Sequence, residues 1–67
     1  MSVAKVTELS ATSKKSFEDA IQKGIARANK SLRNVTGAWI KEQKIDISKG
    51  KITDYRIGMK VTFILDD

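Results

Sequence analysis

Cysteine and histidine are both absent from this 67-residue chain, and their absence excludes several kinds of stabilising chemistry. Without cysteine the chain can form no disulfide, and without either residue type it lacks the usual ligands of a structural zinc ion. A chain of this length forms one domain at most, which we place at residues 1–67, and it buries only about 60% of the surface that it exposes when unfolded. We therefore expect self-association to supply the missing stability.

Catalytic signatures are missing as well. The sequence contains no histidine or cysteine to act as nucleophile or base, no glycine-rich phosphate loop and no GxSxG motif. Glu18 and Asp19 are neighbours in a predicted helix, where adjacent side chains diverge, so they do not form a carboxylate pair. We expect that the protein is not an enzyme. The sequence leaves open whether it binds a metal ion.

Long apolar runs are also absent, since no stretch approaches the roughly 18 residues that span a bilayer. The first residues, MSVAKVTELS, lack the basic and apolar segments of a secretory signal, so we expect a cytoplasmic protein without a membrane partner. The net charge of +5 raises nucleic acid as a partner, but acidic residues are interleaved along the whole chain and no basic run stands out. We expect a solvated surface of mixed charge and no nucleic-acid partner.

Hydrophobic periodicity predicts four elements in the order β-α-β-β. Residues 3–9 mix β-branched and polar side chains over the length of one strand. Residues 14–32 carry apolar side chains at helical spacings, and Thr12 or Ser13 is expected to cap the first turn of this helix. Gly24 lies inside the helix, where it is either merely tolerated or marks a place at which another backbone comes close.

Two further strands are predicted at residues 35–47 and 52–65. Asn34 can leave the helix in a left-handed conformation, and the turn at residues 48–51 has a glycine that can take a positive φ. Apolar and mainly polar residues alternate along the last strand, so one of its faces should lie on a core that the helix covers. The predicted fold is α+β, a three-stranded antiparallel sheet wrapped against one amphipathic helix. Large apolar residues on both faces of strand 35–47, including Trp39, predict subunit contacts along the sheet.

Four stretches of the chain together resemble the dodecins, a family of small β-α-β-β proteins that bind flavin. The first two, KVTELSATSKKSFEDAI and IARANKSLRNV, are similar to the family's first strand and the two ends of its helix. The others, WIKEQ and YRIGMKVTFILDD, are similar to its last two strands. The resemblance covers nearly the whole chain. It implies a hollow homododecamer that stores or buffers a flavin, riboflavin or FMN, rather than a catalyst.

The resemblance also implies where a flavin would bind. In flavin-binding dodecins a tryptophan near the start of the second strand stacks on the isoalloxazine ring, and a glutamine after the tyrosine of the third strand hydrogen-bonds to its polar edge. These two positions fall on Gly37 and Arg56 here, while Trp39 lies two residues beyond Gly37 and points to the same sheet face. The candidate ligand-binding residues are therefore Gly37, Trp39 and Arg56.

Two hypotheses about the ligand follow from these residues. In the first, the shell binds flavin, with Trp39 stacking on the ring and Arg56, whose guanidinium offers only donors, binding an anionic group. In the second, the shell is independent of flavin and binds another ion or small molecule, because Gly37 and Arg56 replace the usual flavin-contacting residues.

Overall fold

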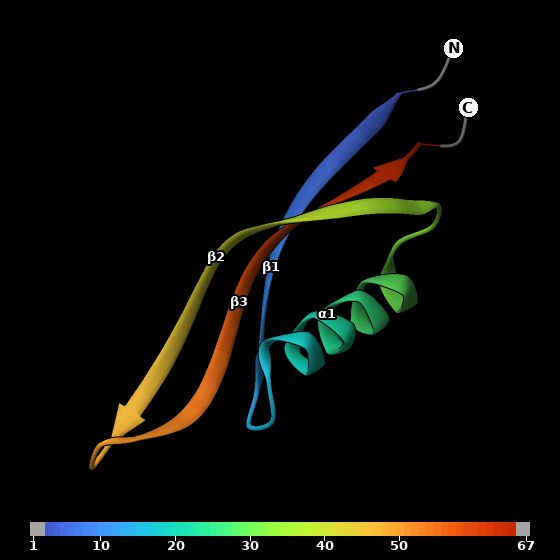
Figure 1. Cartoon of the computed structure of the whole chain (residues 1–67). Helices are drawn as coiled ribbons and strands as arrows, with labels where there is room; N and C mark the ends of the chain where they lie inside the picture. Colours follow the sequence, from blue (N-terminus) through green and yellow to red (C-terminus); the bar gives the residue numbers. More distant parts are fainter. Residues whose placement is uncertain (1–2, 66–67) are drawn as a thin grey trace.

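The computed structural model describes residues 3–65, which form four secondary-structure elements (Figure 1). In chain order these are strand β1 (Ala4–Ser13), helix α1 (Phe17–Ser31), strand β2 (Val35–Ser48) and strand β3 (Lys51–Ile64). The strands pair antiparallel in the order β1-β3-β2, so the last strand lies in the centre of the sheet. This confirms the predicted α+β fold, with its β-α-β-β order and three antiparallel strands.

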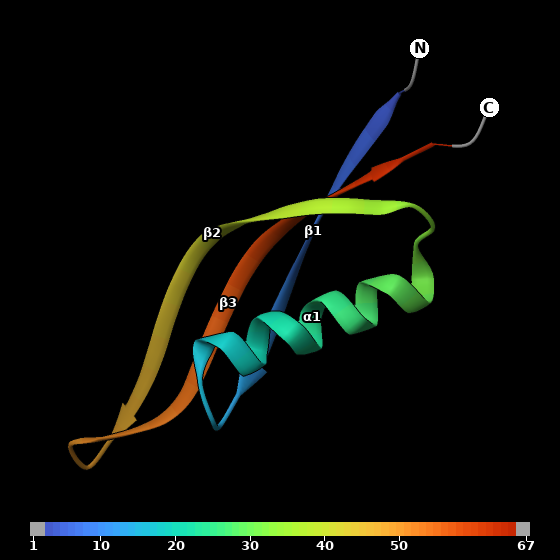
Figure 2. The ribbon, with the colours of Figure 1, turned by 45° about the vertical axis from the view of Figure 1, so that its right-hand side comes forward.

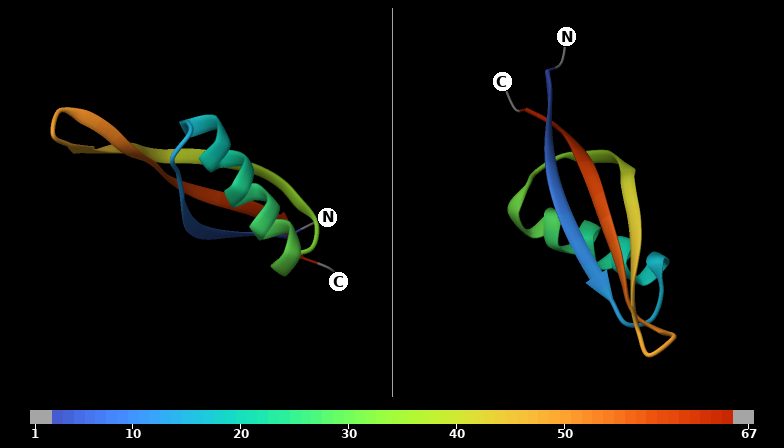
Figure 3. Two further views of the ribbon diagram at one scale, coloured as in Figure 1. Left: turned by 90° about the horizontal axis from the view of Figure 1, so that it is seen from below. Right: turned by 90° about the vertical axis from the view of Figure 1, so that its left-hand side faces the viewer.

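Helix α1 covers one face of the sheet, and the sheet twists around it (Figures 2 and 3). The core between them is small, and its fully buried apolar side chains are Ala20, Ala28, Ile57, Met59 and Val61. The three from β3 are spaced by two residues, which confirms the predicted alternation of that strand. The β2–β3 hairpin extends well beyond the helix at one end of the sheet (Figure 1).

Helix α1 begins later than its apolar periodicity predicts, and its cap is a different residue. Ser16, rather than Thr12 or Ser13, is the N-cap, and its Oγ accepts a hydrogen bond from the backbone N–H of Asp19 at 3.0 Å. Thr12 and Ser13 instead end β1, where Thr12 pairs with Arg56. The prediction was wrong because three hydroxyl side chains stand close together here, and pairing with β3 decides which of them still belong to the strand.

The residues of the described chain that have a positive φ lie in the connections between secondary-structure elements. Asn34 has φ 62°, so the predicted left-handed conformation is confirmed, but the helix itself ends on an extended Leu32 and Asn34 lies in the connection that leads into β2. Lys49 and Gly50 have φ 52° and φ 77° and form the two-residue turn of the β2–β3 hairpin, so the turn glycine does take a positive φ as predicted. Two successive residues with positive φ are typical of a type I′ turn, which matches the twist of the flanking strands.

Large apolar side chains remain exposed outside the core, and all of them lie on strands or just beyond strand ends. They are Val3, Val6, Trp39, Ile40, Ile47, Ile52 and Leu65. The large apolar residues of α1, which are Phe17, Ile21 and Ile25, by contrast pack against the core. Within residues 3–65 no helix is long and apolar enough to cross a membrane.

Candidate ligand-binding face

The sheet has a second face that α1 does not cover, and we call it the helix-free face. Ile57, Met59 and Val61 of β3 point toward the helix, so the residues between them project from the opposite side. Directly paired residues on neighbouring antiparallel strands share a face. The register therefore assigns to the helix-free face Val6, Glu8, Ser10 and Thr12 of β1, Arg56, Gly58, Lys60 and Thr62 of β3, and Gly37, Trp39, Glu42 and Lys44 of β2.

The three residues singled out by the sequence lie on this face, but they do not form one cluster. Trp39 pairs with Lys60 and Gly37 pairs with Thr62, so these two lie side by side along β2. Arg56 is four residues from Lys60 along β3, a separation of about 13 Å at the usual rise of a strand. The structure thus brings Gly37 next to Trp39 and leaves Arg56 apart from both.

Trp39 is half exposed, with 51% of its surface accessible, so it does not plug the core of its own subunit. The Nζ atom of Lys60 lies 5.9 Å from the centroid of its ring, at the outer limit of a cation–π contact. A Cβ atom placed on Gly37 would find no other heavy atom within 4 Å. An aromatic side chain therefore stands beside open surface on this face.

Arg56 is already engaged within its own chain. Its Nε donates a hydrogen bond to Oδ2 of Asp46 at 2.7 Å, and this bond raises the pKa of the guanidinium. Asp46 pairs directly with Asp54 across the hairpin, and like charges at such positions repel one another. Lys44 approaches the same carboxylate at 3.9 Å. The Arg56 guanidinium therefore stabilises the acidic end of the hairpin. An anionic ligand would have to compete with Asp46 for this guanidinium.

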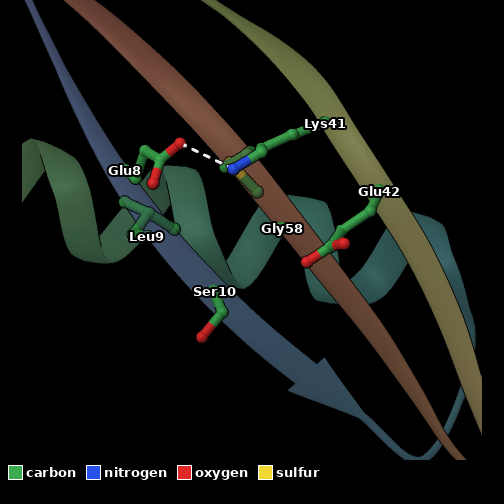
Figure 4. Close-up of a pocket in the computed structure, with 7 residues that line it drawn as sticks. Glu8, Leu9, Ser10, Lys41, Glu42 and Gly58 are labelled. Carbon is green, nitrogen blue, oxygen red and sulfur yellow. Dashed lines mark hydrogen bonds and ion pairs between the residues drawn. The ribbon is translucent and has the colours of Figure 1, made fainter.

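A β-bulge in β2 adds a feature that sequence reasoning missed. The register shifts between Ile40 and Glu42, leaving Lys41 outside the pairing, so that Lys41 and Glu42 both reach over the central strand (Figure 4). Lys41 Nζ donates to Glu8 Oε1 at 3.1 Å, which joins the two outer strands across β3. This hydrogen bond is the main reason that the pKa of Glu8 lies below its ordinary value. We call this contact the Lys41–Glu8 bridge.

A cavity of about 270 Å³ lies beside this bridge, above Gly58 (Figure 4). Glu8 and Ser10 line it from β1, and Lys41 and Glu42 line it from β2. The absence of a side chain at Gly58 makes room for Glu42, because a Cβ atom there would lie 2.9 Å from Glu42 Cγ. The only sign of this cavity in the sequence is Gly58, which has no side chain on the helix-free face of β3, although its neighbours on that face, Arg56 and Lys60, have long ones. Its lining includes both carboxylates and an ammonium group, so it offers charged hydrogen-bond acceptors and a charged donor. Trp39 does not line this cavity.

Residues 3–65 include no group of three or more acidic side chains that could hold a metal ion. The helix-free face instead combines an exposed aromatic ring with a polar hollow. Binding pockets for small molecules commonly combine these two elements.

Known proteins share both the sequence and the fold. The sequence profile of the dodecin family matches residues 3–66. Dodecin of Thermus thermophilus is 35% identical over 65 residues, which cover 97% of this chain and 94% of that protein. Calcium dodecin of Mycobacterium tuberculosis is 41% identical over 64 residues, which cover 94% and 89% of the two chains.

Solved structures agree with the sequence matches. An arginine-to-alanine variant of Thermus thermophilus dodecin superposes with a TM-score of 0.94 at 34% identity, and the match covers 100% of both chains. The calcium-chelating calcium dodecin of Mycobacterium tuberculosis, whose structure contains a calcium-binding site, superposes with a TM-score of 0.82 at 34% identity. That match covers 96% of this chain and 91% of the other. The chain belongs to the dodecin family.

Proposed function

We propose that this dodecin assembles into a hollow homododecamer that binds and sequesters a small ligand, a flavin such as riboflavin or FMN. The observation that carries the proposal is the half-exposed Trp39 beside the open surface at Gly37. A flat ring stacked on the indole would bury apolar area and gain the attraction between aromatic faces. The exposed apolar side chains of the strands support the assembly, because contacts between subunits would cover them.

The residues have separate parts in this proposal. Trp39 stacks on the ring of the ligand, and Gly37 leaves the surface beside the indole open. Arg56 would have to release Asp46 before it could offer its donors to an anionic group, so its part in ligand binding is the weaker one. The protein acts by binding rather than by catalysis, and we place the shell in the cytoplasm.

A flavin titration combined with a mass measurement tests this function. We expect native mass spectrometry of the purified protein to find a particle of twelve 7.4 kDa chains. Titrated riboflavin or FMN should lose its fluorescence as it stacks on the indole. Trp39→Ala should abolish this quenching without changing the number of chains in the particle. Lys49→Ala, in the distant hairpin turn, is the control and should quench as the wild type does. Flavin that stays fully fluorescent at micromolar protein would rule out this ligand.

A second candidate is a flavin-independent dodecin shell that binds an ion or another small molecule. It is favoured by the engagement of Arg56 with Asp46 and by the similarity to a calcium dodecin. Since residues 3–65 of one chain hold no cluster of three acidic side chains, such a site would combine carboxylates from neighbouring subunits. Elemental analysis of the purified shell and calorimetric titration with calcium test it. An intact shell that carries calcium and quenches no flavin would favour this candidate over the first.

A further inference from the structure

We propose that the ligand held on Trp39 is a planar aromatic anion and that Lys60 is its counter-ion. This inference rests on the proposed function, and it adds the charge of the ligand and the residue that recognises this charge. It also assigns to Lys60 the anion-binding role that the sequence led us to expect of Arg56.

Lys60 is placed where it can reach a ring stacked on Trp39. The two residues are direct partners across β2 and β3, and the ammonium lies 5.9 Å from the centre of the indole. At this distance the cation–π attraction is near its limit, so the ammonium can leave the ring when a ligand arrives. The four-carbon stem of a lysine is flexible, which allows Lys60 to follow an acidic group at the edge of the ligand.

The charges around Trp39 leave Lys60 poorly neutralised. Glu8 is the one carboxylate within 4 Å of Lys60 in the part of the chain that the structure describes, and the distance is 3.9 Å. That same carboxylate accepts a closer hydrogen bond, at 3.1 Å, from Lys41. Glu42 also attracts Lys41, so Lys41 interacts with two acidic groups. Lys60, by contrast, has only Glu8, and it shares that carboxylate with Lys41. An anion on the ligand would give Lys60 the partner that Glu8 supplies only in part.

Arg56 is less suited to this role on two grounds. It lies about 13 Å from the Trp39–Lys60 pair along the strand. Its Nε is also 2.7 Å from Asp46, so binding an anion requires breaking an existing ion pair. A neutral ring, in turn, would displace the Lys60 ammonium from the indole without offering it a counter-charge. The site should therefore prefer an anionic ring over its neutral counterpart.

Trp39 is the only tryptophan, so its emission reports on this site alone. We would titrate the assembled protein with two ligand pairs that share a ring system and differ in charge: FMN with riboflavin, and nicotinate with nicotinamide. In each pair the anion should bind roughly twofold to fivefold more tightly, the size expected of an exposed ion pair, and added salt should reduce the difference. Lys60→Gln should remove the preference, whereas Lys60→Arg should keep it.

Lys44→Gln is the matched control, because Lys44 lies on the same face but approaches Asp46 rather than Trp39. It should leave the preference unchanged, and circular dichroism would confirm that each variant is folded. Equal affinities within both pairs, or a preference that survives Lys60→Gln, would overturn the inference while leaving flavin binding intact. If neither flavin binds but nicotinate is preferred through Lys60, the flavin proposal fails and the anion site stands. Absence of Trp39 quenching by all four compounds would refute both.

Discussion

Gly24 shows how a single missing side chain shapes the core. It is buried in the middle of α1, and a Cβ atom there would lie 2.8 Å from Met59 Cε and 3.2 Å from Leu9 Cδ1. Gly24 is therefore not merely tolerated, but the predicted close approach of another backbone was wrong, because side chains of the sheet come close instead. Met59 is itself buried, so it has little freedom to move aside.

We expect Gly24→Ala to destabilise the protein. Alanine gains about 1 kcal/mol of helix propensity, but overpacking a filled core typically costs about 1–3 kcal/mol, so the cost should prevail. Chemical denaturation would measure the change in the free energy of unfolding. Ala26→Gly, at an exposed position of the same helix, measures the propensity alone and should cost about 1 kcal/mol. A Gly24→Ala protein that is more stable than the wild type would show that the core yields at this point.

Ser13 and Asp19 form the polar link between the end of β1 and the start of α1. The buried Ser13 donates its hydroxyl to Oδ2 of Asp19 at 2.5 Å, and Lys23 approaches the same oxygen at 3.1 Å. The Ser13 hydrogen bond first, and then Lys23, hold the pKa of Asp19 below its ordinary value of 3.8. Folding therefore favours the ionised form of this carboxyl group.

This link predicts a defined pH dependence of stability. Because the folded-state pKa of Asp19 is depressed, its contribution is complete above the unfolded value of 3.8 and is lost as the pH falls through the lower folded value. Asp19→Asn should lower the unfolding midpoint at neutral pH and make the acid branch of the stability curve shallower. Thermal unfolding between about pH 2 and pH 7 would record both effects. Glu18→Gln, on the exposed side of the same turn, should change neither, and an Asp19→Asn curve parallel to that of the wild type would contradict the assignment.

Gly37 offers a direct test of the flavin hypothesis at the level of one residue. Open space surrounds its Cβ position, so Gly37→Trp should fold normally and place an aromatic ring where the resemblance to flavin-binding dodecins predicts the stacking tryptophan. Stacking between aromatic groups adds about 0.5–1.5 kcal/mol, so flavin affinity should rise by roughly twofold to tenfold. Lys44→Trp, further along the same face, is the control and should not raise the affinity. Flavin fluorescence titrations that detect no gain for Gly37→Trp would contradict this position of the ring.

Among the elements, the β2–β3 hairpin has a turn residue that its conformation does not favour. Lys49 has φ 52°, a region that a lysine side chain disfavours and that asparagine tolerates better. Lys49→Asn should therefore stabilise the hairpin by about 0.5–1 kcal/mol, while Gly50→Ala, at φ 77°, should destabilise it by about 1–2 kcal/mol. Thermal unfolding of the two variants would measure both shifts. Shifts of the same sign in both would argue against a type I′ turn.

The elements themselves could be predicted from the sequence, but the end of β1 and the start of α1 could not. The spacing of apolar residues in α1 and their alternation in β3 depend on local geometry, and both predictions are confirmed. The end of β1 lies beyond residue 9, where the prediction stopped, because it is set by pairing with β3, from Ala4 opposite Ile64 to Ser13 opposite Tyr55. Such pairing joins residues far apart in the sequence, and local patterns contain no record of it.

From the sequence, residues could be assigned to the helix-free face only where the two-residue alternation of a strand is uninterrupted. Gly37 and Trp39 share a face because no bulge separates them, as the two-residue spacing indicates. The bulge at Lys41, two residues beyond Trp39, interrupts this alternation of faces. It creates the Lys41–Glu8 bridge and the cavity above Gly58. These contacts depend on a register shift and on a third strand, so sequence spacing alone could not reveal them.

At the scale of the whole molecule, the fold has more apolar surface than one subunit can cover. The chain measures 52 × 19 × 13 Å, and its single helix protects only the middle of one face of the sheet (Figures 1 and 3). The exposed apolar residues lie along the strands, while the solvent side of α1 carries Lys23, Arg27 and Lys30. This division leaves the strands, rather than the helix, as the surface for subunit contacts. It agrees with a domain that depends on association for part of its stability.

Ile47 and Ile52 provide the test of that dependence. They pair with each other across β2 and β3 near the projecting end of the hairpin, and they are 62% and 48% exposed in the single chain. Replacing both with lysine leaves the core of the subunit untouched but puts two charges where an apolar contact is expected. Native mass spectrometry and size-exclusion chromatography should then find smaller species, and the midpoint of thermal unfolding should fall because assembly no longer stabilises the fold.

Lys30→Ala, on the solvent side of α1, changes the surface of the helix and should alter neither the mass nor the unfolding midpoint. The wild-type midpoint should also rise with protein concentration, since association favours the folded state by mass action. The double lysine variant should lose most of this concentration dependence. A variant that keeps the wild-type mass and midpoint would place the subunit contacts elsewhere on the strands, and the next positions to test would be Val6 and Ile40, which are also exposed.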